Sequence, residues 1–333
     1  MVVASWIGGW RRVTQASLMA LGLHGLTFLL ALPFAMLVRD QIAEQLGSSL
    51  AAGAVADGVN NDWWREFTAQ ATGLGATFTP SIIGFASTLD AVSRVLDARY
   101  PPTALMWLLG GYLALWTFLS GGVLDRFARQ RPTRAHGFFS ASGRLFFRLA
   151  RLTALGGLIY WFLFAYVHPW LFLDLWRDLT RGLGIERTAF FWRLLFYVIF
   201  GVVLLKLNLV FDYARIRLVV EDRRSALGAL RASLRFLWHH PLDVTALYAI
   251  DGAGFVMLLA LWSVAAPGVY GTGLAMWLAF AAGQLYLLAR LAIKLHFLAS
   301  QTALFQAHLA HASYTAVPAP AWPESPAAEL IPR

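Results

Sequence analysis

The chain has 333 residues, of which 59 % are hydrophobic and only 14 % are charged, whereas a soluble domain has about 25 % charged residues. This composition indicates a membrane protein, so we interpret the net charge of +9, carried by basic residues between apolar runs, as an orientation signal rather than a nucleic-acid site. Cysteine is absent, which excludes disulfides, thiolate metal sites and a cysteine nucleophile.

The first predicted element is an apolar run at residues 17–38, long enough for a helix that crosses a bilayer. It follows the segment SWIGGWRR, in which we interpret Arg11, Arg12 and the neighbouring tryptophans as an anchor in the inner leaflet. The small-residue pattern of residues 54–56 lies too far beyond the run, behind charged residues, for a signal-peptide cleavage site. The run therefore predicts a transmembrane helix.

A long loop at residues 39–102 follows, and it is too long for a connector without structure of its own. Two short helices are expected in it, at about residues 40–56 and 80–97, lying on or dipping into the outer leaflet. The second shows apolar residues at helical spacing. These residues are Ile82, Phe85, Leu89, Val92 and Leu96.

The same loop contains the phrase NNDWWREF at residues 60–67. Asp62 and Glu66 would share one helix face beside Trp63 and Trp64, and carboxylates with aromatic rings can form a sugar or cation site. The competing interpretation, which we favour, is an aromatic anchor at the level of the lipid headgroups.

The next three apolar runs lie at residues 103–124, 152–173 and 190–211. Segment 125–151 holds seven arginines against one acid, and segment 212–243 holds six arginines. The loop 39–102 has seven acids against four arginines. Because arginine and lysine mark the cytoplasmic side, both arginine-rich segments and both termini are expected on the cytoplasmic side of the membrane.

Residues 222–240 form a second interfacial candidate, an amphipathic helix on the cytoplasmic face. Four leucines share one face of it, and Arg224, Arg231 and Arg235 cluster on one flank. Arginines in that position reach anionic lipid headgroups while the apolar face stays in the membrane. The leucines are Leu227, Leu230, Leu234 and Leu237.

Residues 219–238 have the sequence VVEDRRSALGALRASLRFLW. This stretch resembles a segment of the multi-pass membrane domain that accompanies some bacterial glycerophosphoryl diester phosphodiesterases. It also resembles a segment of related membrane proteins of unknown function. Glu221 and the run Ala229-Leu230-Arg231-Ala232-Ser233 carry the resemblance. The resemblance covers about 20 residues and implies an α-helical bacterial inner-membrane protein with a cytoplasmic interfacial helix. It carries no catalytic residue over.

The last two runs lie at residues 244–265 and 273–295. Residues 296–312 are expected to continue the sixth helix along the cytoplasmic surface, and the tail 313–333, with five prolines, to be disordered. The sequence thus predicts an all-α polytopic membrane protein, with one membrane domain over residues 1–312, six transmembrane helices and interfacial helices.

Ionisable residues inside the runs are the best functional pointers. His24, Lys206, Asp251 and Arg290 would lie in one layer of the cytoplasmic half, with Asn208 close to it and Gln284 deeper. One interpretation is a polar cavity with an ion or proton site at Asp251. The other, which we favour, has the two cations reach the headgroups while Asp251 pairs with one of them or caps a bend.

Two histidine pairs are candidate metal ligands. They are His239-His240 and His308 with His311. Adjacent imidazoles do not share a helix face, and the second pair has no evident third ligand. No nucleotide-binding or metalloprotease motif occurs in the sequence. We therefore predict neither a metal nor a cofactor.

Three functions remain open. The first is a non-catalytic accessory, scaffold or assembly subunit of a membrane complex, bound to anionic headgroups and to partner proteins but not to nucleic acid. The alternatives are a small-solute or ion transporter or channel with its polar layer around Asp251, and a lipid-modifying enzyme with its site at the aromatic and acidic patch of the outer loop.

Overall fold

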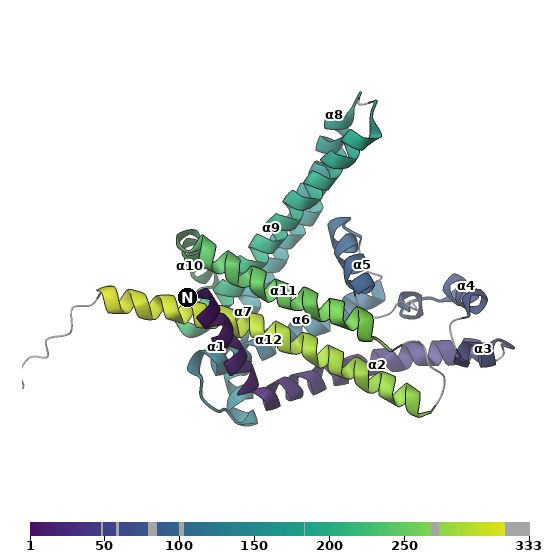
Figure 1. Ribbon diagram of the computed structural model, residues 1–333, viewed down its shortest axis with the longest axis horizontal. Coiled ribbons are helices and arrows are strands. Elements are labelled where there is room, and N and C mark those ends of the chain that lie inside the picture. Colours follow the sequence, from purple (N-terminus) through teal and green to yellow (C-terminus); the bar gives the residue numbers. More distant parts are fainter. Residues whose placement is uncertain are drawn as a thin grey trace, which may run out of the picture.

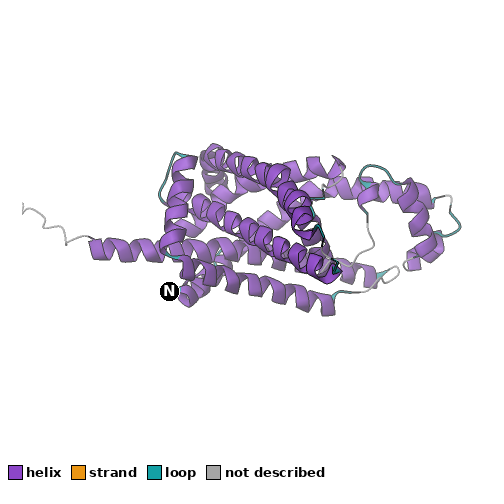
Figure 2. Ribbon diagram, turned by 90° about the horizontal axis from the view of Figure 1, so that it is seen from above, coloured by secondary structure: helices purple, strands orange, loops and turns teal. Residues whose placement is uncertain are grey.

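A computed structural model describes residues 1–47, 49–57, 60–78, 85–99, 103–182, 184–267 and 273–316 of the chain (Figure 1). These residues contain helices and no strand (Figure 2). The helices are α1 (Val2–Thr14), α2 (Ser17–Leu46), α3 (Ala52–Asp57), α4 (Asn61–Gln70), α5 (Phe85–Leu96), α6 (Thr103–Arg129), α7 (Ala135–Phe162), α8 (Trp176–Thr180), α9 (Glu186–Val220), α10 (Ala226–His239), α11 (Pro241–Ala265) and α12 (Leu274–Ala316). One turn of 3-10 helix, η1 (Gly75–Thr77), follows α4, and two π-helical stretches, η2 (Leu163–Val167) and η3 (Trp170–Leu175), lie between α7 and α8.

Six of these helical segments are long and apolar enough to cross a membrane. They are Ser17–Leu46, Leu105–Arg129, Ala135–Thr180, Glu186–Val220, Pro241–Ala265 and Leu274–Ala310. Each contains one of the apolar runs of the sequence or most of it. The protein is therefore an all-α polytopic membrane protein, as predicted.

Several helices extend well beyond the apolar runs. Helix α12 has 43 residues, so it is about 65 Å long, roughly twice the thickness of the hydrocarbon core. It continues to Ala316, which corrects the start of the predicted tail, and residues 317–333 lie outside the described part. Of the predicted helix 80–97, the part from Phe85 on is observed, whereas residues 80–84 also lie outside that part.

One end of the molecule is densely packed, and we call it the base. There α1 and α10 pack across the end of α6, the first half of α7, the end of α9, the start of α11 and the second half of α12 (Figure 1). Large, fully buried side chains of the base include Leu23, Leu119, Leu124, Phe127, Leu145, Leu149, Leu152, Tyr213, Ile216, Leu218 and Phe305. The base-side ends of all six spans meet here, which matches the predicted alternation of the chain.

Residues 296–312 are the clearest departure from the sequence prediction. Residues 296–305 of this stretch do not lie along a surface, because there α12 runs through the middle of the base and contacts α1, α6, α9 and α11. Leu295, Ala299, Ser300 and Leu304 are fully buried. Small residues on α1 make this possible: a Cβ at Gly9 would lie 2.8 Å from Cε1 of His296.

Helix α10 packs on the base through small residues. Its buried face is Ala229, Ser233 and Phe236, and the Ser233 hydroxyl donates a 2.7 Å hydrogen bond to the carbonyl oxygen of Val210 on α9. Leu227 and Leu234 point outward, with 67 % and 52 % of their surface exposed. Two of the four predicted leucines therefore lie on the exposed face of the helix.

The rest of the chain, which we call the distal region, comprises residues 26–112, 157–205 and 252–290 within the described ranges. In Figure 1, the hairpin of α7 to α9 points away from the direction taken by α2, α11 and α12. The share of the apolar window that is buried inside the protein is lowest in the first span, at 6 %, and in the sixth, at 11 %, against 39 % in the second. Their outward surfaces carry large apolar side chains, among them Phe190, Leu205, Leu261, Trp277 and Leu285.

Candidate functional site

Asp251 occupies a sealed site at the centre of the base. One carboxylate oxygen, Oδ2, accepts a 2.7 Å hydrogen bond from the hydroxyl of Ser300, and the other, Oδ1, lies 3.1 Å from Nε2 of His296. The side chains of Asp251 and His296 are 0 % and 2 % exposed. The prediction that Asp251 needs a partner is therefore correct, whereas the expected partner, a long cation, is replaced by a histidine and a serine of α12.

Helix α1 closes this site. Trp10 stacks on the imidazole of His296 with ring centroids 4.3 Å apart, and Trp6 meets the same ring edge-on at 5.5 Å. The two tryptophans lie one turn apart on the helix, on either side of Gly9. The segment predicted as a lipid anchor thus contributes two half-buried aromatic rings that cover His296.

The other residues of the predicted polar layer are each paired separately. His24 donates through Nε2 to Oε1 of Gln284 at 3.1 Å, and Lys206 donates to the Thr245 hydroxyl at 3.2 Å. Asn208 donates to the Tyr248 hydroxyl at 2.9 Å, and the guanidinium of Arg290 lies over the rings of Phe255 and Tyr286. Among the described residues, no hydrogen bond or ion pair joins any two of His24, Lys206, Asn208, Asp251 and Arg290.

A second buried carboxylate, Asp212 on α9, escaped the sequence analysis. The side chain of Asp212 is 11 % exposed. Its carboxylate pairs with Arg215 at 2.9 Å and lies 3.5 Å from the amide nitrogen of Asn208. The sequence signal was present, because an acid follows directly on the apolar run 190–211 and stands four residues after an asparagine. Because the predicted span ends at residue 211, the sequence prediction places Asp212 in the arginine-rich segment and not in the membrane.

Arginines of α9, of α10 and of the turn between them line a cavity of ≈ 340 Å³ at the edge of the base. It is lined by Arg217, Arg223, Arg231, Ala232 and Arg235. Both Arg217 and Arg223 pair with Glu221. Burial raises the pKa of the Glu221 carboxyl, but the hydrogen bonds from the two arginines outweigh this effect. The pKa of Glu221 therefore lies below its usual value. Arg231 and Arg235 have no acidic partner in the described part of the chain.

The sequence predicts one cluster of Arg224, Arg231 and Arg235. In the structure Arg231 and Arg235 line the cavity, whereas Arg224 does not. At the other predicted lipid contact, Arg11 is exposed, whereas Arg12 is half-buried and donates through Nη1 to the carbonyl oxygen of Phe127 at 3.0 Å. Part of the Arg12 guanidinium therefore serves to hold α1 against the end of α6.

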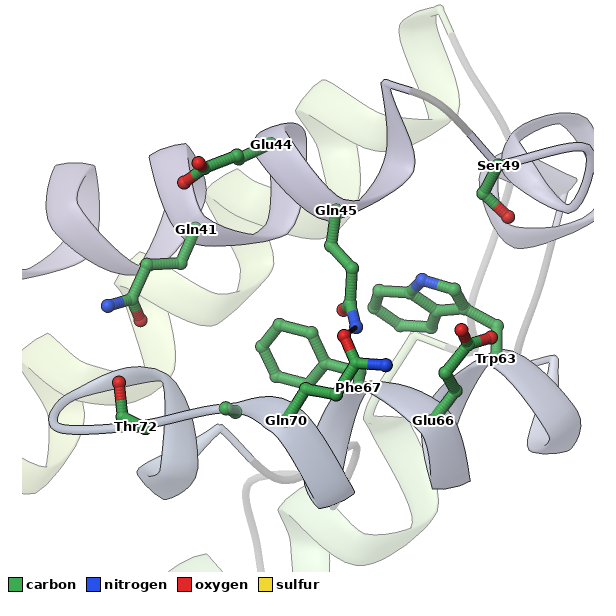
Figure 3. A pocket seen from close by; sticks show the side chains of 10 residues that line it. Gln41, Glu44, Gln45, Ser49, Trp63, Glu66, Phe67, Gln70 and Thr72 are labelled. Carbon is green, nitrogen blue, oxygen red and sulfur yellow. Dashed lines mark hydrogen bonds between the residues drawn. The ribbon is translucent and has the colours of Figure 1, made fainter.

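A second cavity, of ≈ 680 Å³, lies in the distal region between the end of α2 and α4 (Figure 3). Side chains of α2 face those of α4 across it in Figure 3. The lining residues are Gln41, Glu44, Gln45, Ser49, Trp63, Glu66, Phe67, Gln70, Ala71 and Thr72. None of these is basic, so the cavity favours a neutral or cationic ligand that donates hydrogen bonds.

Trp63 gives this cavity an unsatisfied donor. The residue is 7 % exposed, and its indole Nε1 is buried without a hydrogen-bond partner among the described residues. The side-chain oxygens of Gln41 and Gln45 are also buried without a partner. Buried polar groups are normally paired, so these three atoms mark where a polar ligand or water would bind.

The aromatic and acidic patch of the outer loop is thus divided by the structure. Trp63 and Glu66 line the cavity. Asp62 stands in the first turn of α4, where the Asn60 side chain caps the helix, and Trp64 packs against Phe67 and Phe78. The glutamines that complete the cavity could not be recognised from sequence, because they belong to an extension of the first span.

Comparisons with protein-family models, with curated proteins and with solved structures give no match for this chain. Its function must therefore be argued from its own residues.

Proposed function

We propose that this multi-pass membrane protein is a non-catalytic accessory, scaffold or assembly subunit of a membrane complex. The observation that carries the proposal is the contrast in burial along the spans. They are joined firmly at the base, yet only 6 % of the apolar window of the first span and 11 % of the sixth are covered by the chain itself. Such surfaces are suited to lipid and to the helices of partner proteins.

The base would face the cytoplasm of a bacterial inner membrane, with both chain termini on that side. The support is the arginine distribution, since segments 125–151 and 212–243 both join spans at their base-side ends. The resemblance of residues 219–238 to a bacterial membrane domain agrees with this orientation and with an interfacial position of α10.

Anionic headgroups would bind at the arginine cavity. Arg231 and Arg235 lack acidic partners, and beside them α10 exposes Leu227, Leu234 and 86 % of Trp238. An exposed apolar stripe flanked by arginines is the pattern of a helix lying in the membrane interface.

A lipid-binding test follows from the cavity. Replacing Arg231 and Arg235 by Gln should weaken the binding of phosphatidylglycerol to the detergent-purified protein by about 1 kcal/mol for each arginine removed. The control replaces Arg39 and Arg65 by Gln, which changes the net charge equally at exposed positions away from the base. Equal losses in both variants would contradict a specific headgroup site.

The contacts of Asp251 favour a structural role over transport. Its carboxylate contacts His296 and Ser300, the ring of His296 is in turn covered by the tryptophans of α1, and the remaining ionisable residues of the predicted layer are paired elsewhere. The transporter alternative would regain support if Asp251→Asn abolished solute flux in proteoliposomes while the protein stayed folded.

The cavity of Figure 3 favours a second candidate function, the binding or modification of a lipid headgroup or sugar at the outer surface. Trp63→Phe keeps an aromatic ring but removes the indole N–H, so it should weaken the binding of a hydroxyl-bearing headgroup or sugar, whose oxygen would accept that hydrogen bond. Trp64→Phe is the matched control, because Trp64 does not line the cavity. Native mass spectrometry of co-purified lipids would compare the two, and identical lipid profiles would remove this candidate.

The subunit proposal itself is tested by native mass spectrometry after mild-detergent purification from the native membrane. Partner proteins in fixed stoichiometry are expected. A chain that purifies alone and, after reconstitution, moves or converts a solute by itself would overturn the proposal.

A further inference from the structure

Two histidines and an aspartate from distant parts of the sequence meet at the edge of the base. His240 lies between α10 and α11, Asp243 lies in the first turn of α11, and His308 lies near the end of α12. Their ligand atoms all lie within 4.8 Å of one another. Nε2 of His308 is 3.1 Å from Oδ2 of Asp243, and the two imidazole centroids are 4.0 Å apart.

The packing of α11 against α12 places this group. Contacts between the two helices follow a single antiparallel register: Trp262 with Tyr286, Phe255 with Arg290, Asp251 with His296, Tyr248 with Phe297, and Asp243 with His308. His240 lies close to Asp243 because it directly precedes Pro241, the first residue of α11. Phe236 then packs against both imidazoles, with centroids 5.0 and 5.7 Å away.

His308 offers an unsatisfied ligand atom. Its side chain is 11 % exposed, and its Nε2 is buried without a hydrogen bond in the described residues, although Asp243 lies close by. An imidazole nitrogen in this position is normally paired with a donor, an acceptor or a metal. The separation of the three ligand atoms requires only small side-chain adjustments to bring each to about 2.0–2.2 Å from one ion.

We propose that His240, Asp243 and His308 bind a divalent transition metal such as Zn²⁺. Two imidazoles and one carboxylate are ligands that zinc and similar ions accept, and three protein ligands leave a coordination position for water or an exogenous ligand. The ion would link the junction of α10 and α11 to α12. This site is separate from Asp251 and from the arginine cavity, and it does not depend on the function proposed above.

The pairing of His240 with His308 differs from both histidine pairs that the sequence suggested as metal ligands. His239, adjacent to His240, turns its Nδ1 toward the carbonyl oxygen of Arg235 at 2.7 Å and so lies outside the group. The side chain of His311 lies outside the described residues. His239 therefore supplies a matched control one residue from a proposed ligand.

The test uses the full chain purified in detergent through a tag without histidine. Stripped protein would be titrated with Co²⁺, whose visible absorption reports an ordered nitrogen and oxygen site, and then competed with Zn²⁺. We expect one ion per chain in the wild type and in His239→Ala. Affinity should fall by at least about tenfold in His240→Ala and His308→Gln, since loss of even an outer-shell partner costs that much.

A second readout covers the case in which a ligand variant folds poorly. Zn²⁺ should raise the Tm of the wild type and of His239→Ala, because a ligand that binds only the folded state stabilises it, and should not raise that of Asp243→Asn. Absence of Co²⁺ binding in the wild type, or equal affinity and an equal Tm shift in all four variants, would overturn the proposal and leave a histidine–aspartate ion pair.

Discussion

The base and the distal region have opposite relations to their surroundings. In the base, polar side chains such as Asp251, Ser233 and Ser300 are buried and bonded to the same chain. In the distal region, large apolar side chains such as Phe190 and Trp277 are more than half exposed. The difference indicates that specific contacts within the chain define the base, whereas membrane or partner surfaces must cover the distal helices.

The largest test of this contrast is Asp251→Ala. Removing one member of a buried polar group leaves His296 and Ser300 without their partner, so the free energy of unfolding should fall by about 3–5 kcal/mol. The control is Asp90→Ala on α5, where an exposed carboxylate pairs with Arg94 at 2.8 Å. There the change should stay within about 0.5 kcal/mol. Denaturation in detergent measures both, and similar losses would contradict the contrast.

A smaller effect is expected from Gly9→Ala. The added Cβ would lie 2.8 Å from His296 Cε1 and 2.9 Å from Ser300 Cα, so α1 must shift, at a cost of about 1–3 kcal/mol. Gly8→Ala adds the same atom 3.8 Å from Ala303, an ordinary contact, and should be neutral or gain up to about 1 kcal/mol from helix propensity. Thermal melts compare the two variants, and a higher Tm for Gly9→Ala would show that α1 is not packed on α12.

The smallest effect is a local response to pH in the distal region. The Tyr197 hydroxyl donates a 2.5 Å hydrogen bond to Asp97 and, with Arg99 and Arg193 nearby, holds the pKa of that carboxyl below its usual value against the effect of burial. A lowered pKa in the folded state means that this attachment is complete above the ordinary value of about 3.9 and is lost as the pH falls through the lowered one.

Hydrogen exchange measures that response. Exchange in α5 should rise as the pH falls through this range, after correction for the intrinsic rate, while residues 296–305 of the base stay protected. Asp97→Asn lacks the titrating group, so its α5 should show no such step. A step of equal size in the variant would assign the response to another group.

Sequence patterns predicted the class of the protein and its six spans. The reason is that a continuous run of about 20 apolar residues is typical of a helix that crosses a bilayer. They could not predict the base. Its helices meet through small residues such as Gly9, Ala229 and Ser233, while Leu227 and Leu234 point outward. In membrane proteins close helix contact favours small side chains, so the leucine face of α10 did not identify its buried face.

The candidate sites were only partly predictable for a related reason. Trp63, Glu66, Arg231 and Arg235 were selected from local patterns, and each lines a cavity. Their partners come from elsewhere in the chain or from positions assigned to other roles. His296 belongs to residues 296–312, which the sequence places along the cytoplasmic surface. The sequence pattern therefore did not indicate it as a partner of Asp251.

The packing of α1 on α12 also has a consequence for biogenesis. Gly9 and His296, which touch in the finished protein, are separated by nearly 300 residues of chain. At a synthesis rate of about 5–20 residues per second, α1 waits roughly 15–60 s for its main partner to leave the ribosome. During that time its tryptophans have only the membrane, the nearer helices or a chaperone to contact, so the base can close only after all six spans have been inserted.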